Sequence, residues 1–211
     1  MRAIGKSNHG GFMPATPQNN KKIAEESNLT ALMNEILARA HASGATDAAV
    51  SVSHDNGFSV DVRMQEVETV SFHEDKGVSL VVYFGHRKGS ASTTDTSASA
   101  LNKIVEAACE IAKVSSQDPC FGLADRELMI PNHPDLDLYH PWSIEPPQAI
   151  EQGLACEAHA LALDKRITNS DGVNISTYNF CHGYADTHGG RGIIQGTHHS
   201  ISCSLIAKNG K

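Results

Sequence analysis

The chain has 211 residues, and 24 acidic against 17 basic side chains give it a formal net charge of −7. This length can bury the core of one sizeable domain or of two small ones. An acidic surface and an aromatic content of 5% argue against a nucleic-acid partner, which needs basic groups for phosphates and rings for base stacking. The longest apolar stretches, such as residues 78–84, are far too short to cross a bilayer, which excludes a membrane-spanning helix.

The cysteines and the N-terminus indicate the compartment. There is no Cys-x-x-Cys pair, and an odd, scattered set of cysteines is typical of reduced thiols in the cytoplasm. The five are Cys109, Cys120, Cys156, Cys181 and Cys203. The first residues lack the apolar core of a secretory signal and are rich in Gly, Pro and Asn, so we predict a disordered tail over residues 1–26.

The first predicted helix follows Ser27 and Asn28, which are both suitable N-caps. Gly44 supplies the left-handed residue at which helices commonly end. Between them, apolar residues recur at the spacing of one helix face: Leu29, Leu32, Met33, Ile36, Leu37 and Ala40.

Strand patterns of period two come next. Asn56-Gly57 is the strongest short hairpin signal, because a type I′ turn needs two residues with positive φ, and Asp75-Lys76-Gly77 predicts a second turn. Residues 85–95 are small and polar, which favours an edge strand and a loop. We expect four or five short antiparallel strands, with the clearest patterns at residues 48–54, 58–62, 67–72 and 78–84.

A second helix is predicted after residues 95–97 and ends before Pro119, because proline cannot continue a helix. Its buried stripe consists of Leu101, Ile104, Val105, Ala108 and Ala112. Two helices can cover one face of the antiparallel meander, so the fold class is α+β and residues 27–117 are predicted to form an N-terminal α+β domain.

Six of the eight prolines lie in residues 118–147, which predicts an extended linker there. A third helix is expected after Ser143, with Pro146 tolerated in its first turn. Ser170-Asp171-Gly172 predicts a turn, and strand patterns return after it. Residues 148–211 are therefore interpreted as a helix plus strands of an incomplete, mostly β central domain, since Lys208 to Lys211 resemble a hairpin turn without a returning strand.

Twelve histidines invite a search for metal sites. His73-Glu74 begins like the zinc-peptidase motif His-Glu-x-x-His, but residues 75–77 follow and the second histidine is missing. A second set could converge on a cation: His133, Asp135, Asp137 and His140. Alternation along this proline-bounded segment points these side chains in different directions, which disfavours a metal there. Other histidines are interpreted as solvated or strand-face residues: His182, His188, His198 and His199.

The sequence contains no Gly-x-Ser-x-Gly elbow and no Walker loop. Residues 183–196 are glycine-rich but lack a strand-to-helix context, so a flexible connection between strands is favoured over an anion cradle. Cys181 and His182 would face opposite sides of a strand, which argues against a catalytic pair. From the residues alone we assign no catalytic, cofactor-binding or metal-binding residue to this chain.

Five segments occur in an order and spacing that resembles one family. They are Glu66 to Glu68, Arg87 to Asp95, Asp118 to Asp125, Pro134 to Pro141 and Asp164 to Gly172. Together they resemble the PmbA/TldE branch of the bacterial TldD/PmbA family, which comprises U62-like peptidases also named modulators of DNA gyrase. The resemblance extends from about Ser27 to the C-terminus and corresponds to the N-terminal half of family members.

This resemblance implies a cytoplasmic subunit that pairs with a TldD-like zinc subunit in a heterodimeric peptidase acting on unfolded or modified peptides. The zinc motif belongs to that partner, so the resemblance transfers no catalytic or metal residue to this chain. The implied role is to build the dimer and to help enclose the cavity. Two alternatives stay open: a stand-alone peptide- or protein-binding module without catalysis, and a small hydrolase that uses the cluster from His133 to His140.

Overall fold

The computed structural model describes residues 17–129 and 134–208. Within these ranges no helix is long and apolar enough to cross a membrane. The elements follow in the order α1 (Pro17–Ala42), β1 (Asp47–Arg63), β2 (Glu66–Phe84), β3 (Arg87–Thr93), α2 (Ala98–Val114), the short 3-10 helix η1 (Arg126–Leu128), α3 (Pro146–Ala162), β4 (Ile167–Asp186) and β5 (Arg191–Ala207).

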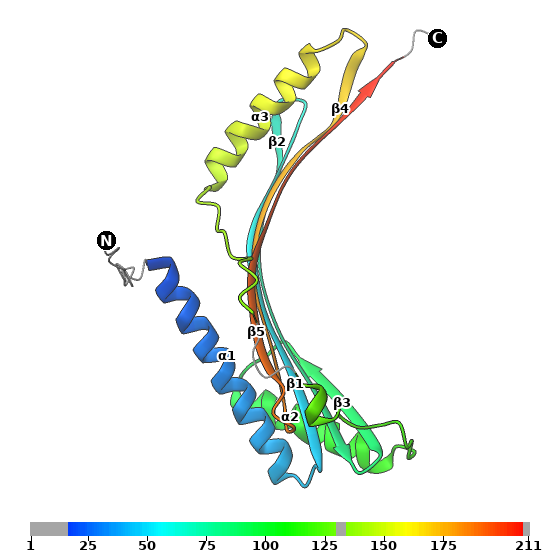
Figure 1. Ribbon diagram of the computed structural model, residues 1–211. Coiled ribbons are helices and arrows are strands. Elements are labelled where there is room, and N and C mark those ends of the chain that lie inside the picture. The colour runs from blue at the N-terminus through cyan, green and yellow to red at the C-terminus, as the bar shows by residue number, and fades with distance from the viewer. Residues whose placement is uncertain (1–16, 130–133, 209–211) are drawn as a thin grey trace, which may run out of the picture.

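The strands form one antiparallel sheet in the order β3-β2-β1-β4-β5, which confirms the α+β class. β1 pairs with β4 from Ala49↔Asp186 to Val62↔Val173, so strands from both predicted units lie in the same sheet. The sheet is bowed, and α1 and α3 lie on its outer side (Figure 1). The boundaries that the sequence indicates between the two units stay a prediction.

Both predicted hairpins within the meander are wrong. β1 runs straight through Asn56-Gly57, and β2 runs through residues 75–77, which pair with residues 53–55 of β1. The actual turn between them is Met64-Gln65, whose φ values of 52° and 64° suit a type I′ turn. Gly57 is needed for another reason, since a Cβ there would lie 2.1 Å from the carbonyl oxygen of Thr177 on β4.

The three helices are where the sequence predicts them, with one corrected start. α1 begins at Pro17, so Ser27 and Asn28 lie inside it and are not its caps, and residues 17–26 of the predicted tail are helical. Residues 1–16 lie outside the described part of the chain. Gly44, with φ of +89°, follows the helix end as expected. The side chain of Ser97 caps α2 by accepting a hydrogen bond from the N–H of Ala100.

All three helices pack on one face of the sheet, because alternate residues of a strand point to the same side. In β1, Val50 and Val52 contribute to a core under α1 and α2, whereas Val60 and Val62 contribute to a second core under α3. These residues are all even-numbered, so they share one face, which we call the helix face. The odd-numbered residues of β1 point to the opposite, concave face (Figure 1).

The chain between α2 and α3 crosses from the concave face to the helix face around the edge of β5. Near η1, the ring of His188 is 2.9 Å from the carbonyl oxygen of Ala124. Further on, the N–H of Thr197 in β5 donates to the carbonyl oxygen of Leu138 at 3.0 Å. The indole of Trp142 then packs edge-on against the ring of His199 and reaches the core under α3.

The turn predicted at Ser170-Asp171-Gly172 is also wrong. These residues lie inside β4, where the register with β5 shifts. Gly172 has a φ of +110°, a conformation that favours glycine. The glycine therefore marks a β-bulge in a strand that continues, and not a turn.

Candidate functional site on the concave face

Small polar residues cover the lower half of the concave face. The antiparallel registers align Ser79, Ser51 and Tyr184 in one row, and Gly77, Ser53 and His182 in the next. None of α1, α2 and α3 packs on these rows, because these three helices use the other face. Such short side chains leave room above the sheet that larger residues would fill.

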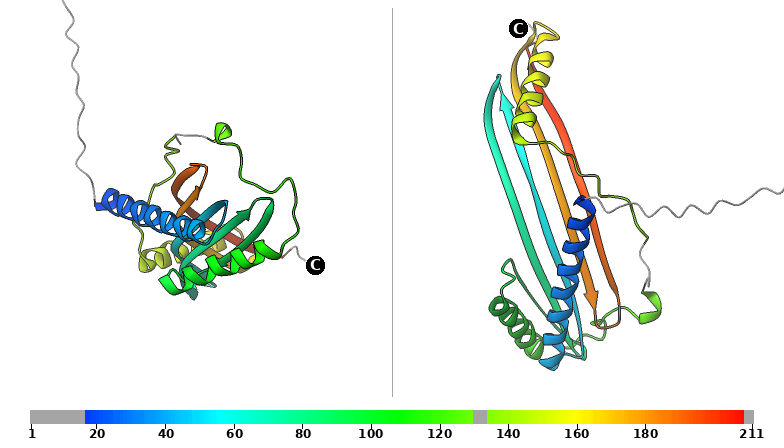
Figure 2. Two further views of the ribbon diagram at one scale, coloured as in Figure 1. Left: turned by 90° about the horizontal axis from the view of Figure 1, so that it is seen from below. Right: turned by 90° about the vertical axis from the view of Figure 1, so that its left-hand side faces the viewer.

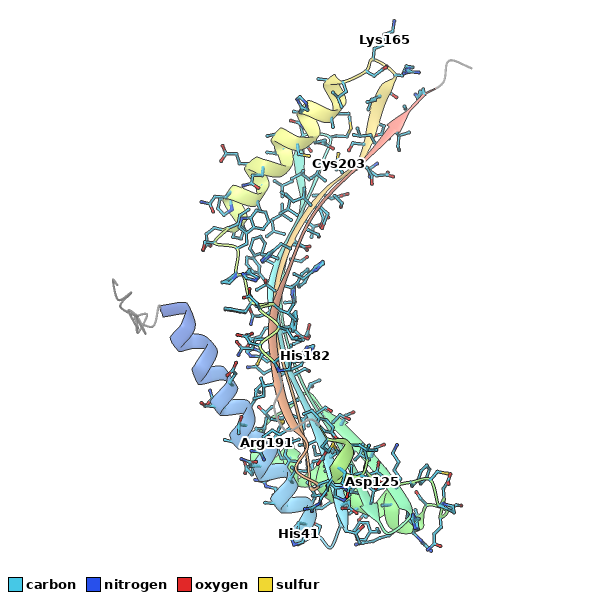
Figure 3. All side chains as sticks on the ribbon, in the orientation of Figure 1. His41, Asp125, Lys165, His182, Arg191 and Cys203 are labelled. Atoms are coloured by element: carbon cyan, nitrogen blue, oxygen red, sulfur yellow. The ribbon has the colours of Figure 1, made fainter. Side chains whose placement is uncertain are left out.

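A cavity of about 1150 Å³ lies over these rows. Ser51, Ser53 and Ser79 contribute to its sheet side, Ile194 borders it from β5, and Leu128 at the end of η1 and Met129 directly after it border it from the other side. Figure 3 places Asp125, at the start of η1, beside the lower half of the sheet on the side away from α1, and His182 near the middle of the sheet. In Figure 1, α1 lies to the left of the sheet and η1 to its right.

The β4–β5 turn fixes one end of this cavity through a buried carboxylate. Oδ1 of Asp186 accepts the N–H groups of His188 at 2.8 Å and of Gly190 at 2.9 Å, and its Oδ2 accepts the hydroxyl of Tyr184 at 3.0 Å. A Cβ on Gly190 would lie 2.3 Å from that carboxylate and 3.1 Å from the sulfur of Met129. Glycine at this position therefore lets the chain after η1 approach the turn.

Two titratable side chains of the cavity have carboxylate partners. The ring of His182 lies 2.8 Å from Oδ1 of Asp55, its diagonal neighbour on β1. Burial, together with the hydrogen bond and the charge of Asp186, raises the pKa of Tyr184 to about 12. The phenol therefore stays neutral near pH 7 and remains a hydrogen-bonding group. Hydroxyls, one imidazole–carboxylate pair and apolar walls suit the binding of an extended, partly apolar ligand.

The upper half of the concave face is polar as well. The rings of His73 and Tyr178 lie 4.5 Å apart, and Tyr178 is followed across the sheet by His198. The amide of Asn174 donates to Asp61 at 2.7 Å. The concave face thus presents hydrogen-bonding groups along its whole length.

The residues singled out for metal chemistry do not come together. His73 points to the concave face, whereas Glu74 points to the helix face and pairs with His54 at 3.1 Å and Lys76 at 2.9 Å. His140 lies 3.5 Å from Oδ1 of Asp137, and His133 lies outside the described residues. In residues 17–129 and 134–208 there is no group of three or more His, Cys, Asp or Glu side chains that could hold a metal ion. Within the described residues, the donors therefore do not form a zinc centre.

The prediction for Cys181 and His182 is confirmed. Cys181 is buried on the helix face, whereas the side chain of His182 is half exposed on the concave face. The cavity itself was not predicted, because the erroneous hairpins divided the strands that carry it. The available signal was the alternation of serines in β1 and β2, as at Ser51, Ser53 and Ser79, which marks a polar strand face.

Comparisons with known proteins agree with this architecture. Two family models match, the PmbA/TldA metallopeptidase domain 1 over residues 48–112 and the PmbA/TldA metallopeptidase central domain over residues 139–211. The chain is 43% identical over 192 residues to the metalloprotease PmbA of Escherichia coli O157:H7. The aligned residues make up 89% of this chain and 40% of that protein. A PmbA homologue of Haemophilus influenzae is 40% identical over 183 residues, with 87% and 40% covered.

Solved structures show the same fold. A protein named as a DNA gyrase modulator from Bacteroides thetaiotaomicron superposes with a TM-score of 0.78 at 22% identity, over 94% of this chain and 43% of that one. TldE from Thermococcus kodakarensis superposes with a TM-score of 0.71 at 14% identity, over 85% and 40%. The chain spans about two fifths of the length of these relatives. It belongs to the PmbA/TldD metallopeptidase family.

Proposed function

We propose that this chain is the N-terminal part of a PmbA/TldE-like, non-zinc subunit of a cytoplasmic heterodimeric peptidase that processes unfolded or modified peptides. Its partner is a TldD-like zinc subunit, which supplies the metal and the hydrolytic chemistry. The observation that carries this proposal is the concave face, because a curved polar sheet without helices suits the wall of a chamber that holds extended peptides.

The arrangement of possible metal ligands in the chain supports the assignment of the zinc to the partner subunit. A catalytic zinc site needs about three protein ligands directed at one point. His73 and Glu74 point to opposite faces of β2, which separates the only sequence pair that resembles a zinc-peptidase motif. The chain therefore contributes binding surface, and no hydrolytic step is assigned to its residues.

The cavity on the concave face suits peptide chains. Its hydroxyl groups, such as Ser51 and Ser79, can pair with peptide amides, and its apolar border at Ile194 and Met129 can cover aliphatic side chains. Strands β1, β4 and β2 have neighbours along this region, so a peptide here would be held by side chains rather than by strand addition.

The test combines metal analysis with peptidase assays. We expect the purified chain to contain no stoichiometric zinc after dialysis against zinc buffer and to cleave neither casein nor short peptides. The longer subunit, mixed with a TldD-like zinc subunit, should cleave peptides, and removal of the metal by a chelator should abolish that cleavage. Stoichiometric zinc bound to this chain alone would contradict the proposal.

A second candidate is a stand-alone peptide- or protein-binding module without catalysis. The cavity favours it, since described residues of this one chain line it. Calorimetric titration of the chain alone with unfolded peptides distinguishes the two. Saturable binding that Ser51→Phe removes would support the module, and the absence of any heat would leave the heterodimer as the better account.

A further inference from the structure

The edge of the sheet at β2 is open over more than half of its length. β1 pairs with β2 from Glu66 to Tyr83, whereas β3 pairs with it only from Val78 to Phe84. In the described part of the chain, residues 66–77 therefore have no strand on their outer side. An open strand edge offers backbone N–H and C=O groups to any extended chain that approaches it.

Several large apolar side chains on or next to this edge are exposed to solvent. Phe72 is 71% exposed, and three further residues are well exposed at 38–48%: Met64, Val67 and Val70. Val70 and Phe72 lie on the helix face beside α3, but α3 packs over β1 and β4 and leaves β2 uncovered (Figure 2, right). Exposed edges are normally protected by prolines or charged side chains; residues 66–77 contain no proline, and their charges are mostly acidic.

A hollow next to Phe72 can receive a side chain from such a partner. The cavity has a volume of about 580 Å³, and Phe58, Phe72 and Trp142 are among its lining residues. The rings of Phe58 and Phe72 lie 6.0 Å apart. The hollow thus continues from the second core to the open edge and suits an apolar anchor.

The charges on this edge indicate which kind of strand can pair with it. Residues 66–77 carry Glu66, Glu68, Glu74 and Asp75 against the single Lys76. A second copy that paired antiparallel about Val70 would place Glu66 opposite Glu74, and a parallel copy would place each acid beside its equivalent. Like charges that face one another across strands are destabilising. The edge therefore favours a basic strand over self-association.

We propose that residues 66–77 of β2 form an acceptor edge, at which an extended segment of a partner protein adds as a further strand. That segment carries apolar side chains on the face toward Val70 and Phe72, and Lys or Arg residues near the acidic groups. The far edge of the sheet does not have this character. β5 carries no Asp or Glu, and the chain at Leu138 already occupies part of its outer side.

The test uses a fluorescent synthetic peptide of about ten residues, a strand-like length, in which Val and Ile alternate with Lys and Thr. We expect saturable binding to the chain in anisotropy titrations and slower amide exchange over residues 66–77 in the complex. Phe72→Lys should weaken binding at least tenfold, about 1.4 kcal/mol, since it removes the anchor and adds a like charge. Ile201→Lys, at another exposed apolar site, on β5, should leave the affinity within about twofold.

Two control peptides separate strand addition from general attraction. A copy with alternate backbone nitrogens methylated cannot pair with the edge and should not bind, and a copy with Glu in place of Lys should bind at least tenfold more weakly. Failure of the basic peptide to bind, or equal binding to the Phe72→Lys and Ile201→Lys variants, would overturn the proposal. Circular dichroism of both variants should confirm that they are folded. None of these measurements involves zinc or cleavage, so the result is independent of the peptidase proposal.

Discussion

Glu157 of α3 fixes the turn between β1 and β2. Its side chain is fully buried, and its oxygens accept the N–H of Met64 at 3.0 Å and that of Gln65 at 2.7 Å. Both turn residues have positive φ, which costs energy for residues with a Cβ. The carboxylate offsets that cost by accepting hydrogen bonds from both backbone donors of the turn.

Replacing this carboxylate should destabilise the fold. We expect Glu157→Gln to lower the free energy of unfolding by about 1–3 kcal/mol, because one amide oxygen cannot replace two carboxylate oxygens and the amide N–H groups would face donors. Urea denaturation followed by circular dichroism measures the change. Glu151→Gln, at an exposed position of the same helix, is the matched control and should stay within about 0.5 kcal/mol of wild type. Equal losses in both variants would contradict the assignment.

The same carboxylate should make stability depend on pH. Burial acts to raise the pKa of Glu157, but hydrogen bonds from Ser170 and from the N–H groups of Gln65 and Met64 outweigh it, so the pKa lies below the ordinary 4.5. A lowered pKa contributes stability above the unfolded-state value, and this contribution is lost as the pH falls through the folded-state value. The difference between wild type and Glu157→Gln should be complete at neutral pH and should shrink below about pH 4. A difference that does not vary with pH would contradict this account.

At the scale of elements, α2 packs directly against the backbone of β3 at Gly89. A Cβ at this position would lie 2.0 Å from the carbonyl oxygen of Ala108 and 2.5 Å from the N–H nitrogen of Ala112. Gly89→Ala should therefore push the helix away from the strand and cost about 1–3 kcal/mol in thermal unfolding. Gly122→Ala is the control, since its Cβ would meet no atom within 4 Å. A wild-type melting temperature for Gly89→Ala would show that this contact is not essential.

Local signals account for the helices but not for the strands. Ser97 through its side chain, and Gly44 and Pro146 through their backbone, mark helix ends, and each lies at the boundary that its residue type predicts. Asn56-Gly57 is a strong local turn signal, but strands on both sides of β1 supply its backbone partners and keep it extended.

The candidate site depends even more on distant pairing. The alternation of Ser51 and Ser53 is visible in the sequence, but only the register with β4 brings His182 and Tyr184 beside them. Local periodicity does not show which strands pair when the paired residues lie more than a hundred positions apart in the sequence. The polar face was therefore predictable strand by strand, whereas the cavity over it was not.

At the scale of the whole molecule, β1 joins the two predicted units. It contributes Val50 and Val52 to one core and Val60 and Val62 to the other, without a break between them. A strand that is common to two cores should couple their unfolding, because loss of either core removes support from the central strand.

We therefore expect one cooperative transition for the entire chain. The chain has a single tryptophan, Trp142, which packs against the core under α3, so its fluorescence reports on that half. Far-UV circular dichroism is dominated by the helices, including α1 and α2 of the other half. The two signals should give the same midpoint in urea and the same transition width, as a two-state unit requires. Fluorescence and circular dichroism transitions that separate reproducibly would instead show two independently stable domains joined by residues 118–147.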